Sequence, residues 1–309
     1  MLYYHIYTAG VPRLKEQSMR LCAALCLIAL PAAAEVPTVV TDIVPVQSLV
    51  AQVMGDLGQP VLLLERGADE HDFQLRPSQM QAIADADLIV WIGPQLTPWL
   101  DRARASSRAV QLGLLEAPGT QVQPYIDASG HADHDHSGID PHVWLNPDNA
   151  ARWLPLIADQ LSAADPANAG AYAANAAAAA TQLTALDRDI AAALAPAANE
   201  PFVTYHNAYG YFAAHYGLTF AGSLADGEAA DPGAAHLTEL QERLRAQNVR
   251  CVFPEAQHDP ALAAQLLDGT SSRLGGALDP VGSTLDPGPQ AYGALMRGLA
   301  DVVMACLRG

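Results

Sequence analysis

Basic residues are scarce in this sequence. Its 309 residues include 16 lysines and arginines and 33 aspartates and glutamates, which gives a formal net charge of −17 at pH 7. Lys15 is the only lysine, and the arginines are scattered singly without forming a basic stripe. We therefore expect neither nucleic acid nor an anionic membrane surface as a partner, because both require clustered positive charge. The acidic excess favours solubility and raises the local concentration of cations.

Long hydrophobic runs are also missing. The apolar stretch near the N-terminus, residues 21–30, has about half of the roughly 20 residues that a membrane-spanning helix needs. Arg20 precedes this stretch, and Ala32-Ala33-Ala34 follows it as a small-residue cleavage site. Residues 1–34 are therefore predicted to be a signal peptide cleaved near Ala34, with Met19 as an alternative start, and the mature protein is expected in the periplasm.

Cysteine is used sparingly, with four residues in the chain. Cys22 and Cys26 lie in the predicted signal peptide, and neither follows the pattern of a lipidated cysteine. Cys251 and Cys306 remain as an even pair in a protein bound for an oxidising compartment, which predicts a disulfide between them. This bridge would close a loop of about 55 residues, worth roughly 4 kcal/mol in the chain-entropy model. Two separate buried thiols are the alternative.

Short β-rich runs alternate with helical segments, which predicts an α/β fold with mostly parallel sheets. In the first half we expect strands at 38–44, 61–64, 88–92 and 110–112, and helices at 47–54, 78–84 and 96–105. In the second half we expect strands at 202–205, 219–222, 249–253 and 277–278, and helices at 208–216, 234–247, 260–267 and 290–307. Because the chain is longer than most single cores allow, we predict two lobes, at 35–165 and 196–309.

An alanine-rich segment separates the two predicted lobes. Apolar residues recur in it at helical spacing, namely Leu183, Leu186, Ile190 and Leu194. We predict one linking helix over 166–195, about 43 Å long, that joins the lobes as a rigid spine. A disordered low-complexity tract is the alternative.

Three histidines occupy equivalent places in distant parts of the chain. His71 lies in a polar loop after a predicted strand, His142 lies just before a predicted helix-forming segment, and His206 lies between a strand and a helix. Ligand groups in open α/β sheets gather at the carboxyl ends of strands, and three histidines at equivalent positions of two facing lobes are expected to form one metal site. Three imidazole nitrogens suit Zn²⁺, which prefers four ligands in a tetrahedron.

The fourth ligand of this predicted site is left open by the sequence. Glu70 and Asp279 are the protein candidates, and a water is the third possibility. Glu255, another carboxylate at a strand end, is expected to accept a hydrogen bond from an imidazole N–H of one of the ligands.

The remaining histidines are not assigned to this predicted site. A short loop at 125–140 carries His131, His134 and His136, and is either a second, weaker metal site or an idle solvated segment. The other positions are expected to be structural, with packing or capping for His215 and surface exposure for His236 and His258.

Several motifs are similar to those of the zinc-uptake substrate-binding proteins of ABC transporters, the ZnuA-like branch of the metal-binding cluster. Between Val36 and Leu307 they run in family order: EHDFQLRPS, ADLIVWIGP, DPHVWLNP, YHNAYGYFAAHYGL, CVFPEAQ and GGALDPVGS. The resemblance implies two α/β lobes joined by a long helix, with metal in the cleft held by His71, His142 and His206. It also implies a monomeric periplasmic protein that delivers Zn²⁺ to an inner-membrane ABC permease.

The resemblance bears on the choice of metal as well. Glu70 matches a position that adds an oxygen ligand in some members, and Asp279 corresponds to the carboxylate ligand of manganese-binding relatives. Those relatives place a glutamate where this sequence has His206. A nitrogen-rich site favours zinc over harder cations, so transport of manganese or iron is the alternative.

Two other classes of protein are rivals to a transport protein. A zinc-dependent hydrolase also uses three histidines and an open position, but this sequence lacks the H-E-x-x-H and G-x-S-x-G signatures. A structural zinc in an adhesin-like surface protein conflicts with ligands at a lobe interface and with the missing lipid anchor. We therefore do not expect an enzyme.

Overall fold

The computed structural model describes residues 1–5, 10, 35–125, 138–225 and 233–309. Residues Ala34–Gly309 form one compact unit, which contains the helices and strands given below. The expected cleavage site near Ala34 and the loop histidines His131, His134 and His136 lie outside the described residues. Within the described ranges, no helix combines the length and the apolar character needed to cross a membrane.

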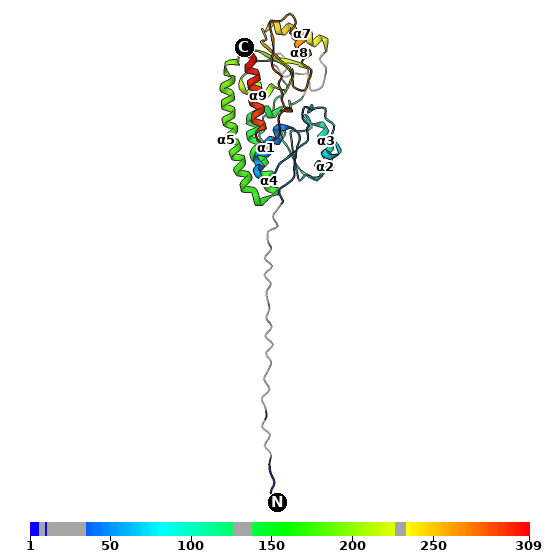
Figure 1. The fold of residues 1–309 in the computed structure, drawn as a ribbon, viewed down its shortest axis with the longest axis vertical. Coiled ribbons are helices and arrows are strands. Elements are labelled where there is room, and N and C mark those ends of the chain that lie inside the picture. Colours follow the sequence, from blue (N-terminus) through cyan, green and yellow to red (C-terminus); the bar gives the residue numbers. More distant parts are fainter. Residues whose placement is uncertain (6–9, 11–34, 126–137, 226–232) are drawn as a thin grey trace. The chain divides into compact units, whose positions relative to one another are not determined.

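Two parallel four-stranded sheets form the centres of two lobes (Figure 1). The first has the order β2-β1-β3-β4, with β1 at Val39–Thr41, β2 at Val61–Leu62, β3 at Leu88–Trp91 and β4 at Val110–Gly113. The second has the order β6-β5-β7-β8, with β5 at Phe202–His206, β6 at Phe220–Ala225, β7 at Cys251–Phe253 and β8 at Arg273–Leu274. The central strands β1, β3, β5 and β7 are almost completely buried, as expected for sheets covered on both faces. The predicted α/β fold with two parallel-sheet lobes is confirmed.

Helices cover both sheets. In the first half they are α1 at Val44–Met54, α2 at Pro77–Asp85, α3 at Pro98–Arg104 and α4 at Pro147–Ala164. In the second half they are α5 at Ala169–Leu194, α6 at Gly210–Tyr216, α7 at Ala234–Ala246, α8 at Ala261–Leu266 and α9 at Ala291–Arg308. Prolines at the first turns of α1, α2, α3 and α4 help to place their starts, because proline fits the first helical position and lacks only an N–H that would be unpaired there.

One predicted strand is wrong. The fourth strand of the second sheet is β8 and not 277–278, where Leu278 forms only an isolated bridge with Glu255. Gly275, directly after β8, passes so close to Phe253 that a Cβ would lie 2.3 Å from its ring. Only glycine permits this approach, and regular pairing stops at this point.

The long linking helix is α5, with 26 residues. The prediction of one α-helix over 166–195 needs correction at both ends, where Pro166–Asn168 and Ala195–Ala197 form 3-10 turns. Its buried residues recur every three or four positions: Tyr172, Ala176, Ala179, Leu183, Leu186, Ile190 and Leu194. They face α1, α4 and α9, so α5 belongs to a helical layer and is not a free-standing spine (Figure 1).

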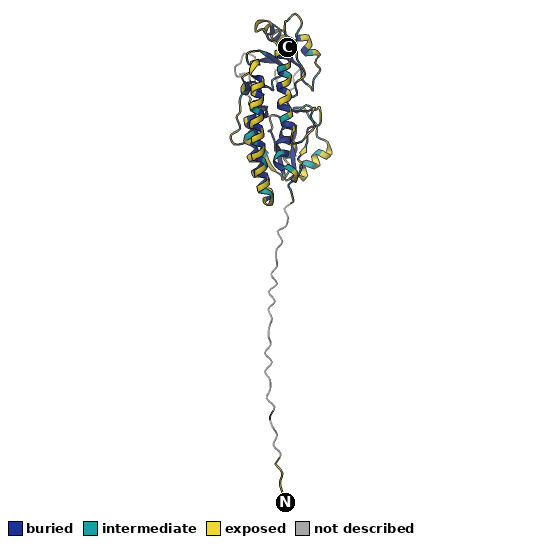
Figure 2. Ribbon diagram, turned by 60° about the vertical axis from the view of Figure 1, so that its left-hand side comes forward, coloured by how far each residue is buried: buried dark blue, intermediate teal, exposed yellow. Residues whose placement is uncertain are grey.

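A continuous hydrophobic core runs through both lobes. It includes the first sheet, the inner sides of α1, α4, α5 and α9, and one face of the second sheet through Phe202, Cys251 and Phe253. The alternate residues Val203 and Val252 face a smaller core beneath α7 and α8, as the two-residue period of a strand requires. Figure 2 shows the helices of the layer buried on one side and exposed on the other. The lobes are therefore held together by packing.

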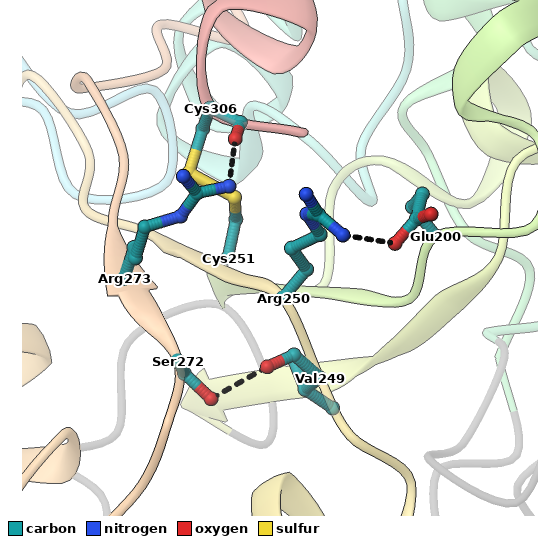
Figure 3. The surroundings of a disulfide bond; sticks show 7 residues. All are labelled: Glu200, Val249, Arg250, Cys251, Ser272, Arg273 and Cys306. Carbon is teal, nitrogen blue, oxygen red and sulfur yellow. Dashed lines mark hydrogen bonds and ion pairs between the residues drawn. A yellow bond between two sulfur atoms is a disulfide. The ribbon is translucent and has the colours of Figure 1, made fainter. Parts of the chain in front are cut away.

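The predicted disulfide joins Cys251 of β7 to Cys306 of α9 across a sequence separation of 55 (Figure 3). Arg273 of β8 donates a hydrogen bond to the carbonyl oxygen of Cys306 at 2.7 Å. The two links tie the C-terminal helix to the second sheet, beside the shared core.

Replacing both cysteines by alanine should lower the stability of the mature protein under oxidising conditions. Loss of the cross-link frees the unfolded chain, with an expected decrease of up to roughly 4 kcal/mol. Thermal unfolding of the Cys251→Ala/Cys306→Ala variant should show a melting temperature about 5–10 °C lower. The reduced wild-type protein is the control and should resemble the variant; equal melting temperatures in all three samples would contradict a stabilising bridge.

Asp42 is a fully buried carboxylate at the carboxyl end of β1. Its Oδ1 accepts a hydrogen bond from the backbone N of Ile43 at 2.9 Å, and its Oδ2 accepts one from the backbone N of Ile92 at 2.8 Å. Burial raises the pKa of Asp42 from 3.8 to about 7, because these hydrogen bonds do not replace the lost hydration of the charged form. Folding therefore favours the neutral carboxyl.

The variant Asp42→Asn should differ from the wild type in how stability depends on pH. In the wild type, the favourable contribution of the neutral carboxyl is complete below pH 3.8 and is lost as the pH rises to about 7. Denaturant unfolding of the metal-free proteins at several pH values should show the wild type losing on the order of 4 kcal/mol relative to the variant across this window. A difference between the two proteins that stays constant with pH would refute the raised pKa.

Candidate metal centre

The three predicted histidine ligands come from loops and strand ends in both lobes. His71 lies in the loop after β2, and His142 directly precedes the 3-10 turn Val143–Leu145, which leads into α4. His206 is the last residue of β5. The carboxyl ends of parallel strands are the usual ligand-binding edge of an open α/β sheet, and both sheets supply residues from this edge.

The structure brings these histidines together with Glu70. One ligand atom from each of the four side chains lies within 4.8 Å of the others. The Nε2 atoms of His142 and His206 are 3.3 Å apart, and the three ring centroids are separated by 5.2–6.0 Å. The group is nearly sealed from solvent, since even the His71 side chain is only 8% exposed. Four donor atoms this close are placed to share one cation.

His142 is oriented by Asp140, a residue that the sequence analysis did not single out. Oδ1 of Asp140 lies 2.7 Å from Nδ1 of His142 and also accepts the backbone N–H of His142 at 2.9 Å. Because a carboxylate accepts hydrogen bonds, Nδ1 carries the proton and Nε2 turns toward the group. A carboxylate two residues before a candidate ligand, separated from it by proline, was the signal available in the sequence.

His206 is oriented in the same way by Glu255. Oε2 of Glu255 lies 2.6 Å from Nδ1 of His206, and Tyr209 donates a weaker hydrogen bond to Oε1 at 3.4 Å. Glu255 is buried and follows β7, where it forms the isolated bridge with Leu278. Because a carboxylate accepts hydrogen bonds, Nδ1 of His206 carries the proton and Nε2 turns toward the group.

Glu70 has the environment of a carboxylate that needs a positive partner. It is 3% exposed, and burial raises its pKa to about 7 although the imidazoles of His71 and His206 oppose this shift. Its Oε1 lies 3.8 Å from Nε2 of His71 and has no hydrogen-bond partner among the described residues. A cation at the centre of the group would stabilise the charged carboxylate and satisfy this buried oxygen.

Asp279, the alternative oxygen ligand, lies outside the four-residue group. Its carboxylate instead accepts hydrogen bonds from the backbone N–H groups of Ser283 and Thr284, both at 2.9 Å. It also accepts a bond from Thr284 Oγ1 at 2.8 Å and one from Gln257 Nε2 at 3.3 Å. Of the two carboxylates, the geometry therefore favours Glu70 as a metal ligand.

The other described histidines have structural contacts away from the group. Nε2 of His215 lies 2.8 Å from Oδ1 of Asp187 in α5, in agreement with a packing role. The expected surface positions of His236 and His258 need correction, because both side chains are partly buried. Nε2 of His236 contacts the Ser223 carbonyl at 3.0 Å, and His258 stacks on Tyr205 with ring centroids 4.1 Å apart.

Three imidazole nitrogens and one carboxylate oxygen form a donor set suited to zinc. Four donors are the number that a tetrahedral zinc site takes, so the group is suited to holding an ion.

Comparisons of the sequence with known proteins agree on one family. A family described as "Zinc-uptake complex component A periplasmic" matches residues 39–306. A protein from Paracoccus denitrificans, the high-affinity zinc uptake system protein ZnuA, is 46% identical over 322 residues, which cover 95% of this chain and 99% of that protein.

Solved structures give the same fold at lower identity. The laminin-binding protein Lmb of Streptococcus agalactiae, described as having adhesin and metal transporting activity, superposes with a TM-score of 0.74 and 24% identity, covering 88% of this chain and 99% of Lmb. FpvC of Pseudomonas aeruginosa in complex with Mn²⁺ gives a TM-score of 0.76 and 24% identity, with the same coverage. At this identity the likeness establishes the fold alone.

Proposed function

This chain belongs to the zinc-uptake complex component A periplasmic family, and we propose that it captures Zn²⁺ in the periplasm and delivers it to an inner-membrane ABC permease. The proposal depends on one observation, the buried convergence of His71, His142, His206 and Glu70. The name of the Paracoccus relative, which refers to high-affinity zinc uptake, supports the same cargo. In this proposal the protein acts as a monomer and contacts its permease transiently.

The choice of zinc over manganese follows from the donor set. Manganese prefers oxygen ligands, and here Glu70 is the carboxylate of the group while His206 supplies nitrogen. Raw affinity alone would also favour copper, so the preference for zinc refers to the harder cations. Transport of manganese or iron is the alternative, because FpvC has a similar fold and is described in complex with Mn²⁺.

A catalytic role is less well supported. The family is one of substrate-binding transport proteins. A zinc-dependent hydrolase needs an open coordination position, and Glu70 lies where it would fill that position. We therefore propose that the protein is not an enzyme.

Localisation and domain limits complete the proposal. The family description is periplasmic, and we propose that residues 1–34 direct export and are cleaved near Ala34. The mature chain would then consist of a first lobe at 35–165, a linking helix at 166–195 and a second lobe at 196–309. A second, weaker metal site at His131, His134 and His136 is an additional proposal that rests on sequence only.

The proposed function is tested by competition titration of metal-stripped mature protein against a chromophoric chelator, with zinc and manganese in parallel. We expect one tightly bound zinc per chain and preference for zinc over manganese. The variant His206→Glu should weaken zinc binding and improve manganese binding relative to it, because it exchanges a nitrogen donor for oxygen.

Deletion of residues 126–137 is the matched control for the loop histidines. Tight zinc binding that survives this deletion would assign the site to the cleft. If zinc binds weakly, or if manganese outcompetes it in the unmodified protein, the zinc-transport proposal is wrong. An unchanged zinc-to-manganese ratio in His206→Glu would exclude His206 as the residue that selects the metal.

The variant Asp140→Asn should lower zinc affinity without removing a ligand. Weaker orientation of His142 is expected to reduce affinity about 10- to 100-fold, the usual effect of losing such a hydrogen-bond partner. Asp148→Asn is the matched control, because it removes the same charge from an exposed position near the start of α4. Chelator competition should show a loss for the first variant only; equal affinities would rule out an orienting role for Asp140.

A further inference from the structure

One segment of the second lobe, residues 279–286, holds the first-lobe loop that carries Glu70 and His71. Three hydrogen bonds cross between the lobes at this point: Gly67 N to Ser283 O at 3.1 Å, Arg66 Nη2 to Thr284 O at 2.6 Å, and Arg66 Nη1 to Asp286 Oδ1 at 2.8 Å.

The same segment also holds the part of the first lobe that carries His142. Nε1 of the fully buried Trp144 donates a hydrogen bond to the carbonyl of Pro280 at 2.8 Å. The Trp144 ring lies 5.2 Å from the ring of His142, centroid to centroid. Tyr292 of α9 donates a hydrogen bond to the Trp144 carbonyl at 2.8 Å and adds a second link between Trp144 and the second lobe. Segment 279–286 therefore contacts both ligand-bearing parts of the first lobe.

Asp279 fixes the conformation of this segment by accepting hydrogen bonds from its backbone. Its Oδ1 and Oδ2 accept the backbone N–H groups of Ser283 and Thr284, which closes a tight turn around Gly282. Gly282 has a φ of +65°, a conformation that glycine adopts readily, and a Cβ there would lie 3.6 Å from Val44 of α1. The bracing by Asp279 presents the carbonyl groups of residues 283 and 284 to the first lobe.

One side of the segment borders a pocket that opens to solvent. The pocket has a volume of about 160 Å³, lies between residues 277–285 and α9, and is lined on the helix by Leu295, Gly298, Leu299 and Val302 among others. Val281 is fully buried in the shared core, so the segment is attached by packing as well as by hydrogen bonds, whereas Thr284 and Asp286 at its end are exposed and are held by Arg66. A change in the bonds of Arg66 should therefore loosen this exposed end of the segment first.

We propose that segment 279–286 is a clamp that closes the metal site from the second lobe, and that Asp279 is the positioning residue that keeps the clamp closed. The inference rests on the proposed function in zinc capture and assigns Asp279 a role other than that of a ligand. Release of a four-coordinate ion requires its ligand-bearing loops to separate, and the clamp holds two of them. The clamp therefore sets the rate at which zinc leaves.

The test is zinc release from zinc-loaded mature protein, followed by stopped flow with excess chelator. Asp279→Asn, which loses acceptors for the turn, should release zinc about tenfold faster, and Arg66→Ala about threefold faster. The double variant should be no faster than Asp279→Asn alone, because both changes break the same connection. Arg76→Ala is the matched control: both arginine side chains are 67% exposed, but Arg76 pairs with Glu65 inside the first lobe. Its release rate should be unchanged.

Cobalt absorption and thermal unfolding separate the clamp from other roles of Asp279. A clamp leaves the visible spectrum of the Co²⁺-loaded protein unaltered in Asp279→Asn, whereas a changed spectrum would make Asp279 a ligand and overturn the inference. Faster release in Arg66→Ala with an unchanged melting temperature supports a clamp over general destabilisation. Unchanged release in both variants overturns the clamp but leaves zinc capture intact, while failure of the unmodified protein to bind zinc overturns both.

Discussion

The metal site depends on the hydrophobic core that the two lobes share. His142 and His206 belong to different lobes, yet their Nε2 atoms lie 3.3 Å apart. Metal sites tolerate errors of only a few tenths of an ångström in donor position, so a flexible connection between lobes could not define this geometry. The layer formed by α1, α4, α5 and α9 supplies the rigidity, because its inner side packs against the first sheet and against one face of the second. The long helix matters as a member of this layer more than as a connector.

Hydrogen bonds to carboxylates determine which nitrogen each histidine offers. Asp140 and Glu255 engage the Nδ1 atoms of His142 and His206, which leaves the Nε2 atoms directed toward each other and toward Glu70. Two imidazoles this close with Glu70 buried beside them form an arrangement that is unfavourable when empty, since the raised pKa of Glu70 reflects a charged form deprived of water. A divalent cation makes this arrangement favourable, because it stabilises the charged carboxylate of Glu70 and prevents repulsion between the donor atoms. The buried donor atoms and the positive ion therefore stabilise each other electrostatically.

The sequence predicted most of the strands and brought His71, His142 and His206 into one hypothesis, because local apolar patterning and strand-end position are visible along a single chain. The sequence did not predict which polar residues form hydrogen bonds to distant parts of the chain. The fourth strand of the second sheet lies at β8 and not at 277–278, and the close approach of Gly275 to Phe253 that follows β8 is visible only in the folded sheet. Asp140 was missed although it lies two residues before His142. Glu70 and Asp279 looked equivalent as oxygen donors, and only the fold separates them, by surrounding one with imidazoles and the other with the N–H groups of a turn.

A protein that carries an ion must hold it tightly and still release it, and these demands fall on different parts of this structure. The donors and their orienting carboxylates are buried, so they set the strength of binding. The hydrogen bonds from Arg66 to Thr284 and Asp286 are exposed to solvent. They hold the loop that carries Glu70 and His71 without involving these two side chains. Exposed hydrogen bonds and ion pairs contribute little to global stability, and for that reason they can open without unfolding the lobes. Opening at this edge would loosen the loop of Glu70 and His71 while the core that positions His142 and His206 stays intact, so the ion could leave without loss of the site's architecture.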